Sequence, residues 1–233
     1  MSRAEMKLDL SRVVFIGRTF YEYMLMFNLS EDELIGRKIL DCPAGACSFT
    51  AIANKKGAVV TATDIAYYHP FEQLAKKGFD DLEHAIINME KVQSNYIWDD
   101  FFGSVAGLKQ QRIQALTDCS NDMKEFSSRY IPAVLPVLPF KDDEFELTLS
   151  AHFLFMYADR LDYEFHKQTV QELLRVSSQE VRIFPLIDLS CNRYEHLDDL
   201  VDFIQTQGYV TEEKTVPYQF QQGANSMLVI KKN

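Results

Sequence analysis

The 233-residue chain lacks the features of a membrane-spanning or secreted protein. It has no apolar run close to the roughly 18 residues that a helix needs to cross a bilayer. Its N-terminal stretch, MSRAEMKLDLSRVVF, contains neither the apolar core nor the small-residue cleavage site of a secretory signal. We therefore expect a cytoplasmic protein with no membrane partner.

Cysteines are few, and their spacing predicts no metal site. Cys42, Cys47, Cys119 and Cys191 form no CxxC pair and no cysteine–histidine cluster with zinc spacing. We interpret all of them as reduced structural thiols.

Basic residues are also scarce. The chain has 24 Lys and Arg against 34 Asp and Glu, a net charge of −10. Binding to nucleic acid backbones requires clustered Lys and Arg, so we expect no nucleic-acid partner. The hydrophobic content of 47% suits a globular core, and no repeat, linker or low-complexity tract divides the sequence. Residues 1–233 are therefore predicted to form a single domain, of undetermined oligomeric state.

The stretch ILDCPAGACSFTAIANKKGAVVTATD (39–64) predicts a strand, a tight loop, a helix and a second strand. Cys42–Cys47 contain a proline, a glycine and otherwise small side chains, so this loop can lie close to a ligand. Ser48 is expected to cap the helix and Gly57 to end it. Carboxyl ends of parallel strands open at one edge of the sheet, where free N–H groups of the loop and Asp64 would face a ligand.

A second informative stretch is LPFKDDEFELTLSAH (138–152). It predicts a buried apolar turn, an exposed acidic turn and a buried strand over Phe145–Leu149. His152 follows this strand at the same sheet edge as Asp64. It is either a general base, because neutral imidazole accepts a proton near neutral pH, or a residue that only shapes the loop.

The remaining segments predict mainly helices. Residues 1–36 are expected to form an N-terminal helical extension, in which Ser30 and Glu33 have the spacing of a capping box. Residues 71–128 are too long for one crossover helix, and predict either an inserted helical cap over the ligand edge or helices that thicken one sheet face. Their apolar residues at helical offsets are Leu82, Ile86, Met89, Trp98, Phe101, Phe102, Val105 and Leu108. Arg112 is left open between a pocket-facing residue and a solvated charge.

After the His152 loop, Asp162–Val176 is expected to form a helix with His166 on its surface. Val181–Leu189 predicts a strand with a bulge or kink at Pro185, because proline cannot donate to the ladder. A helix over His196–Gln207 and two final strands over 209–216 and 225–231 complete the prediction.

Two of these motifs resemble those of class I S-adenosylmethionine (SAM) dependent methyltransferases. The segment DCPAGAC (41–47) is similar to motif I, a strand followed by D-x-G-x-G-x-G, with Pro43 and Cys47 in place of the first and third glycines. Asp64 stands where the family has the acid that binds the ribose hydroxyls. The segment 138–150 resembles the family's L-P-F-x-D-x-x-F-D-L-V. The resemblance covers about residues 36–66 and 129–231.

The resemblance implies an α/β fold with a doubly wound, seven-stranded, mostly parallel sheet in the order 3-2-1-4-5-7-6. Strand 7 is expected to be antiparallel, and residues 71–128 to form the inserted helical cap. It also implies transfer of a methyl group from SAM to an unidentified, small-molecule acceptor.

The resemblance further assigns candidate roles to particular residues. Asp41 would fix the loop or the cofactor's amino group, and Arg18 or Tyr21 would close over its amino-acid end, where Arg18 can pair with a carboxylate. His152 is the catalytic candidate and, with Ser150, would face the acceptor. The implied cofactor-binding residues are Asp41, Pro43, Ala44, Gly45, Ala46, Cys47, Ser48, Asp64, Ile65, Val134, Leu135, Ser150, Ala151, Arg18 and Tyr21. The family often has Asp-Ala beside adenine; here Val134-Leu135 would leave backbone and apolar contacts only.

Three alternatives remain open. The chain could bind SAM or its demethylated product S-adenosylhomocysteine (SAH) without transferring a methyl group. It could be an NAD-dependent oxidoreductase, for which Asp64 also fits, although the predicted C-terminal strand pair disfavours it. It could methylate protein or RNA, which the acidic balance and the absence of an N-P-P-Y-type motif disfavour.

Overall fold

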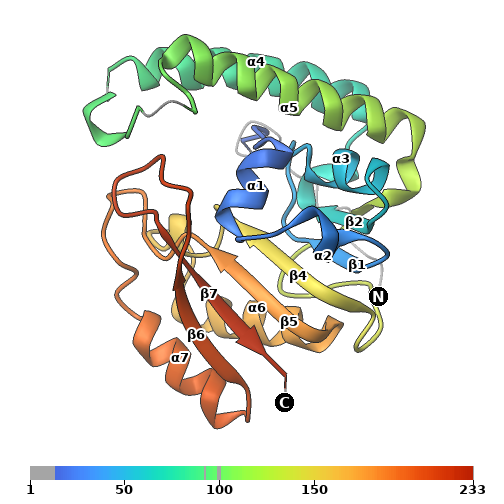
Figure 1. The fold of residues 1–233 in the computed structure, drawn as a ribbon, viewed down its shortest axis with the longest axis vertical. Coiled ribbons are helices and arrows are strands. Elements are labelled where there is room, and N and C mark those ends of the chain that lie inside the picture. The colour runs from blue at the N-terminus through green and yellow to red at the C-terminus, as the bar shows by residue number, and fades with distance from the viewer. Residues whose placement is uncertain (1–13, 92, 99–100, 233) are drawn as a thin grey trace, which may run out of the picture.

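The computed structural model describes residues 14–91, 93–98 and 101–232 (Figure 1). Within these ranges a seven-stranded sheet has the order β3-β2-β1-β4-β5-β7-β6. Strands β1 to β5 pair in parallel, and β7 is antiparallel to both β5 and β6. The predicted topology is therefore confirmed. The strands are β1 (Lys38–Asp41), β2 (Val59–Asp64), β3 (Tyr130–Pro132), β4 (Phe145–Ala151), β5 (Ser177–Phe184), β6 (Val210–Thr215) and β7 (Ser226–Lys231).

Helices cover both faces of the sheet. The helices are α1 (Phe20–Met26), α2 (Glu31–Leu34), α3 (Phe49–Lys55), α4 (Phe71–Met89), α5 (Val105–Glu125), α6 (Tyr163–Val176) and α7 (Leu197–Thr206). Buried side chains of α1 and α3 pack in one core with α4 and α5, and those of α6 and α7 pack in another core. Successive residues of β7 alternate between the two cores, Val229 in the first and Leu228 and Ile230 in the second, as the period of two requires.

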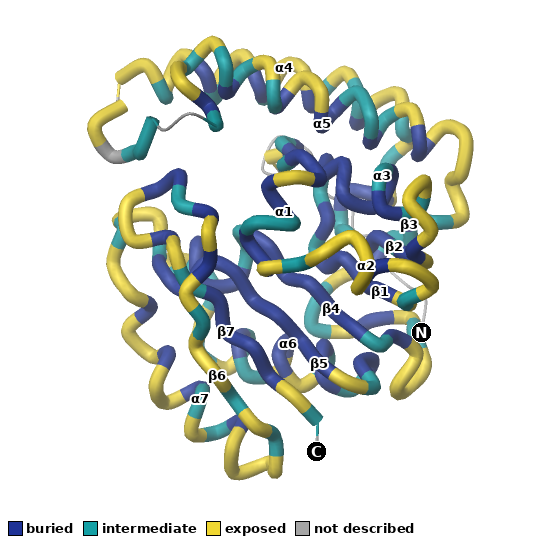
Figure 2. Tube along the Cα trace, in the orientation of Figure 1, coloured by how far each residue is buried: buried dark blue, intermediate teal, exposed yellow. Residues whose placement is uncertain are grey.

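The inserted segment forms the outermost layer of the first face. Helices α4 and α5 pack along each other and cross the top of the molecule in Figure 1. Their outer faces are exposed, whereas β4, β5 and β7 are buried over most of their length (Figure 2). This arrangement places the inner side of the α4–α5 pair near the carboxyl edge of the sheet.

The predicted helical stripe from Trp98 to Leu108 is only partly correct. Helix α5 begins at Val105, after Ser104 caps it by accepting a hydrogen bond from the N–H of Gly107 at 3.2 Å. Trp98 instead packs on Phe220, with ring centroids 5.4 Å apart. Trp98 and Phe102 therefore pack on the loop between β6 and β7 and do not belong to one face of a helix.

Two expectations for the second half of the chain are wrong. Strand β5 ends at Phe184, directly before Pro185, so the strand has no internal kink at this proline. His166 is fully buried, not on the helix surface. Its ring stacks on Phe155 and Tyr194, and its nitrogens lie 2.6 and 3.0 Å from backbone carbonyl oxygens.

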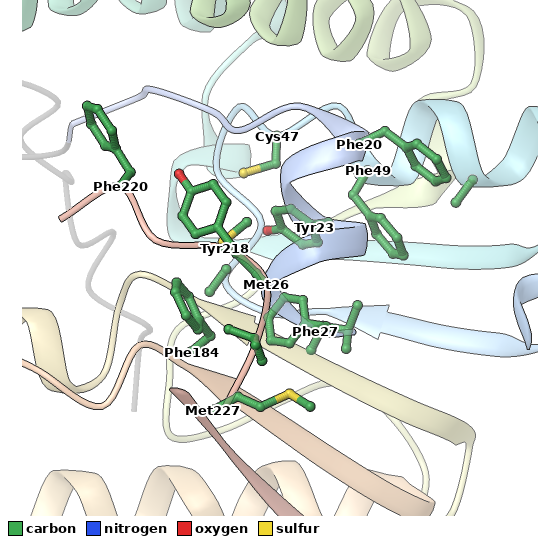
Figure 3. Close-up of a cluster of buried hydrophobic side chains, with 14 of the residues drawn as sticks. Phe20, Tyr23, Met26, Phe27, Cys47, Phe49, Phe184, Tyr218, Phe220 and Met227 are labelled. Carbon is green, nitrogen blue, oxygen red and sulfur yellow. The ribbon is translucent and has the colours of Figure 1, made fainter. Parts of the chain in front are cut away.

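The N-terminal extension is helical over α1 and α2. The capping box predicted from Ser30 and Glu33 is confirmed at α2. A second capping box joins Thr19 and Glu22 at the start of α1. Figure 3 shows Phe20 and Tyr23 of α1 beside Phe49 of α3. Tyr23 stacks on Phe49 at a centroid distance of 4.9 Å.

Candidate functional site

A cleft lies at the carboxyl edge of the sheet and consists of two adjoining cavities. The β3-side cavity has a volume of about 380 Å³ and the cap-side cavity about 290 Å³. Volumes of this size suit small-molecule ligands. The residues that line both cavities are Val14, Pro43, Asp64, Phe153 and Tyr157. Because these walls are shared, we treat the two cavities as halves of one cleft.

The loop after β1 is held by its neighbours on both sides of Gly45. The Gly45 N–H donates to Oδ2 of Asp64 at 2.9 Å, and its carbonyl accepts from the Tyr67 hydroxyl at 2.7 Å. Gly45 has a φ of +54°, a left-handed conformation that favours glycine. The one glycine kept in this loop is therefore required by the backbone.

The N–H groups of this loop are mostly used within the protein. Ala44 donates to the Thr63 carbonyl, Gly45 to Asp64, Cys47 to the Ala44 carbonyl, and Ser48 to the Arg18 carbonyl. The prediction that these N–H groups are free to face a ligand is therefore wrong. A ligand in the cleft contacts mainly side chains and the surface of the loop.

Asp64 lies at the junction of the two cavities. Besides the bond from Gly45, its Oδ1 accepts from the N–H of Ala66 at 2.8 Å. Burial raises the pKa of Asp64 above its ordinary value of 3.8, although the two N–H bonds oppose this shift. Each oxygen of a carboxylate has a further lone pair, so Asp64 is held in place and can still accept from a ligand hydroxyl.

Asp41 is buried beneath the loop and does not line either cavity. Its Oδ1 accepts from the Tyr23 hydroxyl at 3.0 Å, while Oδ2 is buried without a hydrogen-bond partner. Burial raises the pKa of Asp41 well above its ordinary value; the bond from Tyr23 opposes this and the charge of Asp64 adds to it. Among the residues that the structure describes, no group donates to this second oxygen.

The segment 14–18, which we call the strap, covers the outer side of the loop. Gly17 lies against the Ala46–Cys47 peptide so closely that an added Cβ would be 1.8 Å from the Ala46 carbonyl oxygen. The Arg18 N–H donates to Sγ of Cys47 at 3.2 Å, and Phe15 N–H donates to Asp81 of α4. The strap thus joins the loop to the helical cap.

Several predicted residues lie in the cleft. The cap-side cavity is lined by Arg18, Pro43, Ala44, Gly45, Cys47, Asp64, Ala151 and His152. The β3-side cavity is lined by Pro43, Asp64, Ile65, Val134 and Leu135. The structure therefore brings together residues from the strap, the loop, β2, the turn after β3 and the end of β4.

Four other predicted residues lie outside the lining of the cleft. Tyr21 is on the outer side of α1 and is 63% exposed. Ala46 is buried under the strap. Ser48 is buried and its hydroxyl accepts from the Phe20 N–H, so it does not cap α3 with its side chain as predicted. Ser150 is buried with its hydroxyl unpaired, because its position on β4 points it into the core.

His152 is held in an unusual backbone conformation. Its φ is +50°, and its N–H donates to the Phe184 carbonyl at 2.7 Å. Its Nδ1 is buried and has no hydrogen-bond partner within residues 14–91, 93–98 and 101–232. Burial lowers the pKa of His152 well below its ordinary value of 6.5, and the charges of Arg18 and Arg112 lower it further. The ring is therefore a neutral imidazole at neutral pH.

Two arginines line the cap-side cavity, and they differ in their partners. Arg112, on α5, forms an ion pair with Glu22 of α1, with Nη2 2.9 Å from Oε1. The Tyr218 hydroxyl also donates to Glu22, at 2.8 Å. The Arg18 guanidinium has no hydrogen-bond partner among the described residues, and its Nε is buried. Arg18 is therefore the uncommitted cation of the cleft.

Some features of the site carry no signal in the sequence. Glu22 and Arg112 are far apart in the chain, so their pairing cannot be read from spacing. Phe220, which lines the cap-side cavity, and Tyr218, which bonds to Glu22, both come from the loop between β6 and β7 (Figure 3). Gly17, which permits the strap contact, is not part of any motif.

The described residues offer neither a clustered metal site nor a membrane-spanning helix. In the described part of the chain, no three or more His, Cys, Asp or Glu residues are grouped so that they could hold a metal ion. The described helices include none with the length and apolar character needed to span a membrane.

Comparison with solved structures shows the fold. Magnesium protoporphyrin IX methyltransferase from Synechocystis, crystallised with SAH, matches with a TM-score of 0.52 and 11% identity over 92% of this chain and 84% of that one. The same enzyme with bound SAM matches with a TM-score of 0.50 and 12% identity over 92% and 80%. The chain therefore has the class I methyltransferase fold.

Comparison of sequences gives a full-length relative. The uncharacterized protein MJ0045 of Methanocaldococcus jannaschii is 38% identical over 228 residues, which are 97% of this chain and 99% of that protein. No protein-family model matches the sequence.

Proposed function

The chain belongs to the same family as MJ0045 of Methanocaldococcus jannaschii, and we propose on this premise and its fold that it is a SAM-dependent methyltransferase with a small-molecule acceptor. The observation that carries the proposal is the position of Asp64. It ends β2, binds the loop after β1 and lies between the two halves of the cleft. In open α/β folds this is where an acid accepts from a ribose diol.

The β3-side cavity suits the adenine of SAM. Ile65, Val134 and Leu135 give it an apolar lining next to Asp64. No acidic side chain is needed there, because an aromatic base is also held by apolar contact and backbone groups. We assign the nucleoside to this half of the cleft.

The cap-side cavity suits the amino-acid end of SAM. Arg18 has no hydrogen-bond partner for its guanidinium in the described part of the chain, and a carboxylate would give it charge-assisted hydrogen bonds. Asp41 lies beneath the loop and outside the lining of this cavity, so of its two proposed roles we assign it that of fixing the loop.

SAM, when bound, supplies an electrophilic methyl group on its sulfonium. The protein's part is to position the acceptor in line with that group and to exclude water, since alignment supplies most of the rate enhancement in such a transfer. We propose that His152, neutral and at the cleft, accepts the proton of the acceptor.

Calorimetric titration with SAM and SAH tests the cofactor assignment. Asp64→Ala should weaken SAM binding by about tenfold or more, because hydrogen bonds to a charged group contribute about 1.5–3 kcal/mol. Asp202→Ala, which removes an exposed acid of α7, is the matched control and should bind as the wild type does. Unchanged affinity of Asp64→Ala, or binding of NADH in place of SAM, would contradict the proposal.

A transfer assay separates an enzyme from a protein that only binds the cofactor. Purified protein, methyl-labelled SAM and a cell-extract metabolite fraction should yield labelled small molecules. The label should form more slowly when His152→Ala replaces the wild type under the same SAM saturation. SAM binding without any labelled product would instead favour a binding protein of the same fold.

A further inference from the structure

The charges that line the cap-side cavity either have a partner in the protein or are assigned to the cofactor. Among the described residues, its charged side chains are Arg18, Asp64 and Arg112. Arg112 is neutralised by Glu22, which is fully buried and accepts from Arg112, Thr19 and Tyr218. On the proposed function, Arg18 takes the cofactor carboxylate and Asp64 the ribose. No lining charge then remains for the acceptor.

A charged acceptor is therefore disfavoured. An ion that enters such a cavity without a partner loses its hydration and gains no compensating bond, which costs several kcal/mol. The acceptor that fits this half of the cleft is uncharged.

The walls of the cavity indicate an aromatic acceptor. Rings come from Tyr96, Phe153, Tyr157 and Phe220, and Tyr96 and Phe220 lie with centroids 4.7 Å apart. Aromatic rings prefer offset or edge-to-face contact with another ring, so such walls select a flat apolar body. Thioethers add favourable contacts at ring edges, and two methionines, Met89 and Met156, line the same cavity.

The polar groups of the cavity favour a ligand that carries a hydrogen-bond donor. His152 is neutral, and neither ring nitrogen has a hydrogen-bond partner among the described residues. Gln221 donates its amide N–H groups to the carbonyl oxygens of Asp188 and Leu189, which leaves its own Oε1 as an acceptor. These two acceptors favour a ligand that presents an O–H.

We infer that the cap-side cavity binds a small, uncharged aromatic alcohol, with its ring between Phe153 and Phe220 and its hydroxyl at His152. This inference rests on the proposed function. In the reaction the hydroxyl oxygen forms the new bond to the methyl carbon. The carbon–sulfur bond breaks with its electron pair staying on sulfur, and the hydroxyl proton passes to His152 and then to solvent.

Binding of matched probes to the SAH-loaded protein tests the inference. Para-cresol, para-toluate and para-methylanisole share one ring and one methyl group but differ in charge and in the hydroxyl donor. We expect para-cresol to bind about tenfold or more tightly than either of the other probes. Para-toluate would bury its carboxylate without a partner, and para-methylanisole would leave His152 without a hydrogen-bond donor. Calorimetry and saturation-transfer NMR measure these affinities without any turnover.

Variants localise the probe. Phe220→Leu should weaken para-cresol binding, whereas Phe79→Leu, at an exposed ring of α4, should not. His152→Phe should remove the preference for para-cresol over para-methylanisole. Circular dichroism checks that each variant is folded, and the comparison of the three probes on the wild type does not depend on any variant.

The outcomes separate this inference from the proposed function. Failure to bind SAH in the first titration overturns the proposed function and the inference with it. If the protein binds SAH but binds para-toluate as tightly as para-cresol, only the inference is overturned. The same holds if it binds SAH but does not bind para-cresol.

Discussion

Replacement of Glu22 by glutamine should destabilise the protein by about 3–5 kcal/mol, the usual effect of breaking a buried ion pair. Glu22 is fully buried and Arg112 is 5% exposed, so the change leaves the arginine charge uncompensated. The geometry also argues for a large effect. The carboxylate accepts from Thr19, Tyr218 and both terminal nitrogens of Arg112, and an amide would turn its NH₂ toward some of these donors.

Urea unfolding followed by circular dichroism measures this effect. Removing both charges, with Glu22→Gln and Arg112→Met together, should cost less than the sum of the single changes, by a coupling energy of about 1–3 kcal/mol. The matched control is Glu83→Gln, which breaks the exposed pair with Lys109 between α4 and α5 and should cost less than about 1 kcal/mol.

The pH dependence gives a second check on the same pair. Burial opposes ionisation of Glu22, but the charge and hydrogen bonds of Arg112 outweigh it and lower the pKa below its ordinary value of 4.5. The folded state therefore releases this proton more readily than the unfolded state. The stabilisation is complete above pH 4.5 and is lost as the pH falls through the lower folded value, so the wild type should approach Glu22→Gln in stability there. A Glu22→Gln protein as stable as the Glu83→Gln control at neutral pH would refute the reasoning.

Three further predictions concern the cleft. Gly17→Ala should displace the strap, because its Cβ would lie 1.8 Å from the Ala46 carbonyl oxygen, and should lower both the melting temperature and SAM affinity; unchanged values would contradict the strap contact. Arg18→Leu should weaken SAH binding by about tenfold while leaving adenosine, which has no carboxylate, bound as before. His152→Ala should lower the rate of methyl transfer by a larger factor than it lowers the affinity for SAM. Equal reductions in rate and affinity would mean that His152 only lines the cavity. Because the folded pKa of His152 is below 6.5, the wild-type rate should stay level through pH 6.5 and fall only at lower pH.

The fold was predictable because its signals are local. Most of the strands are short apolar runs, and the order of turns and helices between the strands restricts the topology to few choices. Asp64 was predictable for the same reason, since the end of β2 in a parallel unit fixes its place relative to the loop after β1.

The details of the site depend on contacts between distant segments. Tyr21 and Tyr23 are two positions apart in one apolar helix, yet Tyr21 is 63% exposed and Tyr23 is buried on Asp41. Only the packing of α1 on the sheet decides which ring turns inward. Ser48 has the type and position of a helix cap, but the Phe20 N–H, brought in by the N-terminal segment, takes its hydroxyl.

The contact between Gly17 and the Ala46 carbonyl requires a glycine in the strap, whereas the related motif has its glycines in the loop after β1. In a glycine-rich loop, the missing side chains admit a ligand; here a missing side chain on a distant segment admits the polypeptide itself. Searches for remote homologues that score the loop alone would pass over proteins built in this way. Searches that score a small residue before α1 together with an acid at the end of β2 would recover them.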